Sequence, residues 1–149
     1  MNLFLKNFER KFVEIHNRSN EFIQTVPEEK LFYKPIKTYS IFSCGEFVLR
    51  SAGRVEQTFG GITTRLWDDP FEWTLPEELA THQKIREYLE EVAQTRRKAF
   101  DFFKTDDDLA KEIPTPDGMK NLFSILLETI ADAENMLGRA ASIQKIING

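Results

Sequence analysis

The sequence has very few of the residues that most often build metal sites and disulfides. Its single cysteine, Cys44, excludes an internal disulfide and a zinc site made of cysteines. Its two histidines, His16 and His82, exclude a metal site that takes three imidazoles from one chain. No apolar run approaches the roughly 20 residues that span a bilayer, and the charged first residues do not resemble a signal peptide. We therefore expect a cytoplasmic protein that does not associate with membranes.

Basic residues are also fewer than acidic ones. Lysine and arginine number 20 against 24 aspartates and glutamates, which gives a formal net charge of −4. Because nucleic-acid binding needs a basic face, we expect no nucleic-acid partner. The content of 41% hydrophobic and 30% charged residues is typical of a globular chain. The length of 149 residues predicts one domain, residues 1–149, and the 13 phenylalanines predict an aromatic core.

Glycine and proline are rare, and they gather at the breaks between segments whose apolar residues recur at helical spacing. Ser43 and Glu46 fit a capping box that begins the second of these segments. Pro76 fits the first position of the third helix, and Gly60-Gly61 weakens the end of the second. No long alternation of apolar and polar residues predicts a strand. The expected helices cover residues 2–25, 43–62, 75–103 and 119–147. The pattern predicts an all-α four-helix bundle with a long connection between helices two and three.

Four segments of the chain, in this order, carry a family resemblance. They are VPEEKLFYKP (26–35), SCGEFVLRSAGRVE (43–56), TDDDLAKEI (105–113) and DAENMLGRAASI (132–143). Together they resemble motifs of the DinB-like superfamily of bacterial four-helix-bundle proteins, over nearly the whole chain. The resemblance implies the same fold and, because relatives often dimerise, a homodimer.

The resemblance also implies where a metal would lie. DinB-like proteins typically hold zinc or nickel with three histidines, one on helix two and a pair four residues apart on helix four. Counted from Gly138, the matching positions on helix four are Asp132 and Met136. The position on helix two is Ser51 in one count of the motif spacing and Arg50 in the other. Such residues make a poor zinc site, so we expect the family metal to be absent, and we expect no other cofactor.

An empty metal position leaves room for a side-chain cation. Arg50 or Arg96 could pair with Asp132 in the cleft that the metal would occupy. Arg96 lies on the apolar stripe of the third helix, where an unpaired charge is costly. The alternative for Arg96 is that its stem is buried and its guanidinium reaches water.

The remaining candidate residues have structural and functional interpretations. Cys44 lies in the first turn of helix two, where a thiolate can be reactive, but a lone cysteine is most often a small apolar filler. His16 and His82 are expected to be structural, with His82 at the rim beside Glu78. The three aromatic residues of the loop 63–74 predict a lid over the bundle or a dimer contact; they are Trp67, Phe71 and Trp73. The acidic run 106–108 is expected to be solvated.

Three hypotheses for function follow, and catalytic residues stay unknown in all of them. The first is a diverged DinB-like protein that works as a small-molecule binding or interaction module. The alternative is a thiol-dependent S-transferase of the bacillithiol or mycothiol type, in which Asp132 and an arginine bind the anionic thiol. The third is a metal site built from carboxylates on the helices. The carboxylates considered for it are Glu46, Glu56, Glu128 and Asp132.

Overall fold

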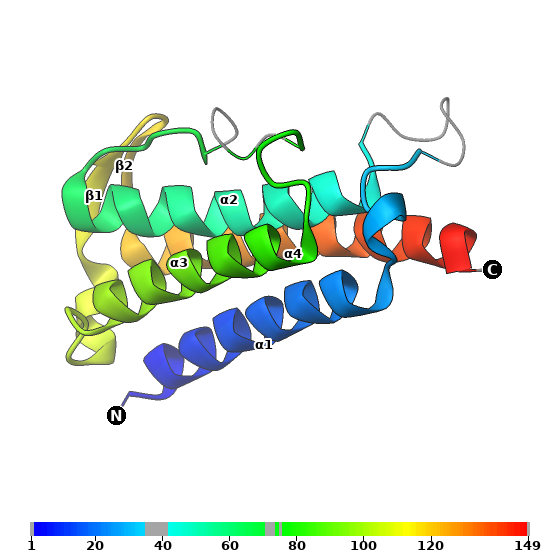
Figure 1. Ribbon diagram of the computed structural model, residues 1–149. Helices are drawn as coiled ribbons and strands as arrows, with labels where there is room; N and C mark the ends of the chain where they lie inside the picture. The colour runs from blue at the N-terminus through cyan, green and yellow to red at the C-terminus, as the bar shows by residue number, and fades with distance from the viewer. Residues whose placement is uncertain (1, 35–41, 71–73, 75, 149) are drawn as a thin grey trace.

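The computed structural model describes residues 2–34, 42–70, 74 and 76–148. Most of this part of the chain lies in four long helices that pack side by side around one core (Figure 1). The helices are α1 (Leu3–Thr25), α2 (Cys44–Thr64), α3 (His82–Phe100) and α4 (Leu122–Asn148). The predicted all-α class is therefore confirmed. In the described residues, no helix is both long enough and apolar enough to pass through a bilayer.

The long connection between α2 and α3 makes these two helices run in the same direction. Its described parts run back along α2, so α2 and α3 begin at the same end of the molecule (Figure 1). α1 packs mainly against α3 and α4, and α2 packs mainly against the same two helices from the opposite side. The interface between α2 and α4 is the most extensive of these.

The two helix starts expected from local sequence signals have different outcomes. The capping box at α2 is confirmed: Ser43 Oγ accepts from the amide of Glu46 at 3.2 Å, and the Glu46 carboxylate accepts from the Ser43 amide at 3.2 Å. The start of α3 near Pro76 is wrong, because the helix begins at His82. The side chain of Thr81 accepts from the Lys84 amide at 3.1 Å there.

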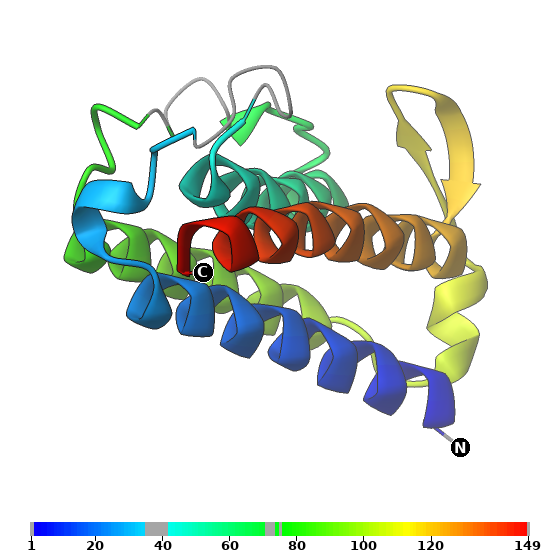
Figure 2. The same ribbon diagram turned by 90° about the vertical axis from the view of Figure 1, so that its right-hand side faces the viewer.

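The expected connection between α3 and α4 contains a small β-hairpin that the sequence pattern did not reveal. β1 (Glu112–Thr115) pairs antiparallel with β2 (Gly118–Asn121), and the hairpin projects beyond the helices (Figure 2). Gly118 has φ +111°, a conformation that favours glycine, at the end of the turn. The first strand contains Pro114 and the second has one apolar residue, Met119, so neither segment shows the alternation of apolar and polar residues that predicts a strand.

Short 3₁₀ helices lie before α2 and after α3: η1 (Glu28–Lys30) and η3 (Asp106–Ala110). The acidic run in η3 is not simply solvated. The carboxylate of Asp106 accepts from the amides of Phe4 and Leu5 at 3.1 and 2.9 Å, so it caps the first turn of α1. This bond ties the start of the chain to the segment that precedes the hairpin.

The core is aromatic, as the phenylalanine content predicts. Phe12, Phe59 and Phe100 come from α1, α2 and α3, and their ring centroids are 5.0 to 6.1 Å apart. Edge-to-face and tilted contacts of this kind add about 0.5–1.5 kcal/mol per pair beyond simple burial. The three rings therefore join three helices at one level of the core.

Candidate functional site

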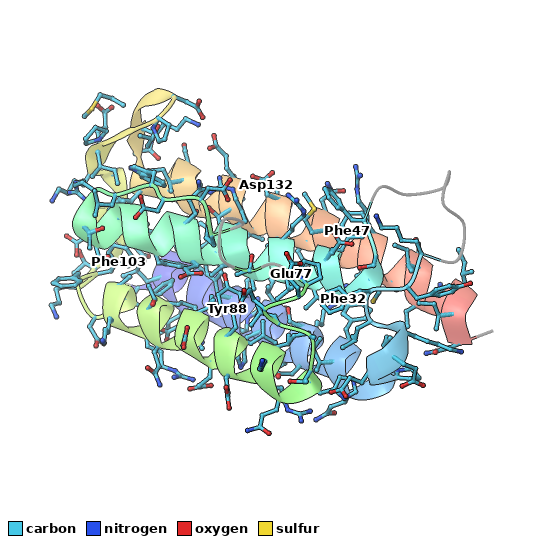
Figure 3. All side chains as sticks on the ribbon, turned by 45° about the horizontal axis from the view of Figure 1, so that its top comes forward. Phe32, Phe47, Glu77, Tyr88, Phe103 and Asp132 are labelled. Carbon is cyan, nitrogen blue, oxygen red and sulfur yellow. The ribbon has the colours of Figure 1, made fainter. Side chains whose placement is uncertain are left out.

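The positions that the family resemblance assigns to metal ligands do not form a ligand set. Ser51 is fully buried, and its hydroxyl donates to the carbonyl of Ala133 at 3.0 Å. Asp132 lies at the exposed margin of α4, on the other side of α2 from Tyr88 (Figure 3). Met136 is partly buried and packs against the core. In the described part of the chain, no three histidine, cysteine, aspartate or glutamate side chains gather as metal ligands.

The alternative carboxylate site is not assembled either. Glu46, Glu56, Glu128 and Asp132 each bond to a different partner: Ser43, Tyr88, Lys120 and Arg54, respectively. No three of these carboxylates gather closely enough to hold one ion, so this hypothesis is wrong for the described residues.

A cation does lie beside Asp132, and it is Arg54 of α2. Arg54 Nε and Asp132 Oδ2 are 2.9 Å apart. Arg54 Nη1 also donates to Thr58 Oγ1 at 2.7 Å, and Thr58 Oγ1 lies 2.6 Å from Thr129 Oγ1. Thr129 donates its own proton to the Ile125 carbonyl at 2.8 Å, so the Thr58 hydroxyl must donate to Thr129. A continuous chain of hydrogen bonds thus runs from the exposed Asp132 carboxylate into the buried interface of α2 and α4.

The two arginines expected beside Asp132 lie elsewhere. The guanidinium of Arg50 stacks over the ring of Phe42, 3.8 Å from its centroid. Arg96 lines a small cavity between α1, α2 and α3 together with His16. Arg96 is 4% exposed, and none of its guanidinium nitrogens is a fully buried atom without a hydrogen-bond partner, which is compatible with a buried stem whose guanidinium reaches the surface. Asp132 forms its ion pair with Arg54 instead, one helical turn beyond Arg50.

A ligand-sized cleft adjoins the Arg54–Asp132 pair. We call it the hairpin cleft, because the β1–β2 turn forms one wall and α2 and α4 form the floor. Its volume is about 300 Å³, at the lower end of the range for small-molecule sites. The lining residues are Arg54, Gln57, Trp67, Thr115, Pro116, Asp117, Lys120, Ile125 and Glu128.

The charges of the hairpin cleft are balanced. Lys120 Nζ lies 3.0 Å from Glu128 Oε2 and 3.7 Å from Asp117 Oδ2. The hydrogen bond to Glu128 raises the pKa of Lys120, so this amine stays charged. With Arg54 and Lys120 as cations and Asp117 and Glu128 as anions, the lining offers fixed groups of both signs.

Trp67 closes one side of the hairpin cleft, and Gly61 makes room for it. A Cβ at Gly61 would overlap the indole ring, whereas a Cβ at Gly60 would meet nothing closer than the Leu66 carbonyl at 3.6 Å. The indole Nε1 of Trp67 is buried without a hydrogen-bond partner, and Gln57 donates to its backbone carbonyl at 3.3 Å. Trp67 therefore packs on α2, while Phe71 and Trp73 lie outside the described residues.

Cys44 and the two histidines have structural surroundings. Cys44 is fully buried, and burial raises the pKa of its thiol to about 12, which favours the apolar-filler interpretation. The ring Nε2 of His82 bonds to the Val26 carbonyl at 2.8 Å, and its amide donates to Glu28 at 2.7 Å. The partner of His82 is thus Glu28 rather than the expected Glu78.

Sequence reasoning also missed a buried pair between α2 and α3. The hydroxyl of Tyr88 donates to the carboxylate of Glu56. Burial raises the pKa of Glu56 and, more strongly, that of Tyr88. Neither group lines the hairpin cleft, so the pair joins the two helices away from the candidate site.

Comparison with known proteins adds no assignment. No family model matches the chain, and no curated protein matches it. The DinB-like resemblance therefore depends on the four sequence segments and on nothing further.

Proposed function

We propose that this protein is a divergent DinB-like four-helix protein that binds a small polar molecule in the hairpin cleft and does not use the family metal. The observation that carries the proposal is the cleft itself. It has about 300 Å³ of space, an aromatic wall and fixed charges of both signs. The guanidinium of Arg54 beside Asp132 supports the second part, because it supplies the positive charge that a metal ion would bring.

The charge pattern favours a zwitterionic ligand of about the size of an amino acid. Each cation of the cleft already has a carboxylate partner, so a singly charged ligand would displace one member of a pair and leave that member without its counter-ion. A ligand with both an ammonium and a carboxylate group can replace both members of such a pair. Trp67 and Ile125 give its apolar part a surface to pack on.

A titration with free amino acids tests this proposal. The amino acids and their N-acetyl amides, which lack both charges, would first be screened by thermal unfolding. Those that raise Tm would then be titrated by calorimetry. We expect selected zwitterions to bind and their blocked forms not to bind. Lys120→Gln should weaken binding at least tenfold, whereas Lys145→Gln, an exposed lysine on the far part of α4, should leave it unchanged. Equal affinity of the two variants would place the ligand elsewhere, and no binding by any zwitterion would refute the ligand class.

The absence of the family metal and the alternative enzyme have their own tests. Elemental measurement of the purified protein should find well under one equivalent of zinc or nickel; one full equivalent would refute the metal-free proposal. Incubation with bacillithiol or mycothiol and a chlorinated aromatic electrophile tests the S-transferase. If the wild type turns over these substrates and Arg54→Gln does not, the protein is an enzyme that acts at the hairpin cleft, and the proposal of a binding module is wrong.

We also infer a homodimer in the cytoplasm. An exposed apolar patch supports the dimer: Phe4 and Leu127 are each about half exposed, and Phe4 packs edge-to-face on Phe123 at 5.5 Å. Light scattering should give twice the chain mass, and Leu127→Glu should return it to the chain mass. Fractionation of cells that express the tagged protein tests the location.

A further inference from the structure

A second cleft lies at the end of the bundle where α2 and α3 finish. Its volume is about 280 Å³, and we call it the end cleft. Its floor is apolar, because the buried side chains of Ile62, Ile113 and Leu122 line it. Phe103, which also lines it, lies at this end of the molecule between α2 and α3 (Figure 3). Among the described residues, the end cleft and the hairpin cleft share no lining residue, so the end cleft can hold a ligand of its own.

Arg65, at one wall of the end cleft, has a backbone conformation that favours glycine. It follows the last residue of α2 with φ +64° and is the only non-glycine residue with a positive φ in the described part of the chain. Helices often end this way with glycine, because a Cβ is strained in this conformation. The Arg65 amide donates to the Gly61 carbonyl at 2.9 Å, a bond that glycine would form equally well. The backbone therefore does not explain an arginine at this position, and the explanation must come from its side chain.

The guanidinium of Arg65 is fixed at the wall of the end cleft. Its Nη1 donates to the carbonyl of Ile62, a residue of the cleft floor. A guanidinium has five N–H donors, and the structure gives the others no partner among the described residues. Because water alone solvates these donors in the free protein, they are open to a ligand in the cleft.

The described lining of the end cleft carries one net positive charge. Lys111 is its second cation, and Asp108 is its one carboxylate. The Asp108 carboxylate accepts from the amides of Lys104 and Thr105 at 2.6 and 3.1 Å, and these bonds lower its pKa, so it stays ionised. Asp108 thus caps the start of η3, and within the described residues neither Arg65 nor Lys111 has an ion-pair partner. In the hairpin cleft, by contrast, both cations are paired with carboxylates.

We propose that the end cleft binds a small monocarboxylate with an apolar body. The net charge of the lining favours a single negative charge, and the fork of the Arg65 guanidinium matches the geometry of a carboxylate. The apolar floor and the ring of Phe102, which is 70% exposed, give the body a surface to cover. Both cations are exposed and solvated, so binding needs the charge and the apolar body together. This site is independent of the function proposed for the hairpin cleft.

Fluorine NMR of para-fluorophenylacetate, titrated with the full chain, tests the proposal. The acid should bind at least tenfold more tightly than para-fluorophenylacetamide, which has the same body without the charge. Acetate, which has the charge without the body, should not displace the acid at equal concentration. Equal binding of the acid and the amide would show an apolar surface that does not recognise anions, and an unchanged fluorine signal would show no site. Either result would overturn the proposal.

Two arginine variants test where the acid binds. Arg65→Gly should bind the acid at least tenfold more weakly and bind the amide as the wild type does, because only the charged group is lost. Its Tm should stay within about 2 °C of the wild type, because glycine adopts the left-handed conformation without strain. Arg86→Gln is the matched control, since it removes an exposed arginine near the start of α3, away from the end cleft, and it should leave binding unchanged.

The apolar part of the site has a separate test. Phe102→Ala should weaken binding of the acid and the amide alike, because it removes surface that their shared body covers. Unchanged affinity of Arg65→Gly for the acid would refute the site. A loss of affinity in Lys120→Gln but not in Arg65→Gly would place the acid in the hairpin cleft and would refute the end cleft as well.

Discussion

The packing of Trp67 on α2 makes a sharp prediction for two adjacent glycines. In a helix interior, alanine is favoured over glycine by about 0.8–1 kcal/mol. Gly60 and Gly61 both lie in α2, so helix propensity alone predicts that Gly60→Ala and Gly61→Ala stabilise the protein equally. The structure separates them, because only the Cβ at Gly61 would overlap the Trp67 ring.

The two substitutions are expected to change the free energy of unfolding in opposite directions. Gly60→Ala should raise the free energy of unfolding by about 0.5–1 kcal/mol, which corresponds to a Tm increase of about 1–4 °C for a chain of this size. Gly61→Ala must either strain the contact, at a cost of about 1–3 kcal/mol, or displace the indole and lose its burial. The net effect is a destabilisation of about 0.5–2 kcal/mol after the gain in helix propensity is included.

Urea unfolding followed by circular dichroism measures both changes, and tryptophan emission reports on the indole. In a Trp73→Phe background, Trp67 is the only tryptophan. Its emission should shift to longer wavelength in Gly61→Ala and stay unchanged in Gly60→Ala. If Gly61→Ala were as stable as Gly60→Ala with unchanged emission, the packing of Trp67 on Gly61 would be refuted, and with it the aromatic wall of the hairpin cleft.

Three further predictions concern buried groups outside that wall. Ser51→Ala should lower the free energy of unfolding by about 1 kcal/mol in urea, because the hydrogen bond to the Ala133 carbonyl is lost; a neutral effect would contradict this bond. The Cys44 thiol should react with Ellman's reagent only after unfolding, because it is buried and its pKa is raised to about 12; rapid reaction of the native protein would contradict that burial. Burial raises the folded-state pKa of Glu56 above its ordinary 4.5. Between pH 4.5 and this raised pKa the folded state binds more protons than the unfolded state, so the free energy of unfolding falls as pH rises through this range. Glu56→Gln keeps an acceptor for Tyr88, and it should gain stability over the wild type from pH 4.5 upward and keep the gain at pH 7; parallel stability curves across pH would contradict this.

The parts of the fold that local chemistry determines could be predicted from the sequence. The start of α2 is one, because Ser43 and Glu46 satisfy each other's backbone amides within four residues. The start of α3 is not, although Pro76 in the first turn of an expected helix is also a good local signal. The side chain of Thr81 caps the helix from the adjacent position, and the amide of His82 bonds to Glu28, a residue 54 positions earlier. A local cap and a contact between distant segments thus hold the start at His82 together. A single sequence does not reveal which distant carboxylate will cap a helix.

In the candidate site, too, one part could be predicted from the sequence and another depends on tertiary packing. A cation beside Asp132 could be expected from the sequence, since Ser51 and Met136 do not support the dication that the family resemblance implies. It could not identify the cation as Arg54. Arg50 and Arg54 are four residues apart and share one face of α2, so helical periodicity treats them as equivalent.

What distinguishes these two arginines is the register of α2 against α4, which depends on tertiary packing. The Ser51 hydroxyl bonds to the carbonyl of Ala133, and the Thr58 and Thr129 hydroxyls meet one another, so the two helices are held at two levels of their interface. Between those levels, Asp132 stands opposite Arg54 rather than Arg50. Because Thr58 also accepts a hydrogen bond from Arg54, the same contact that sets the register holds the guanidinium in place beside the cleft. The register of this interface thus determines both the partner of Asp132 and the floor of the hairpin cleft.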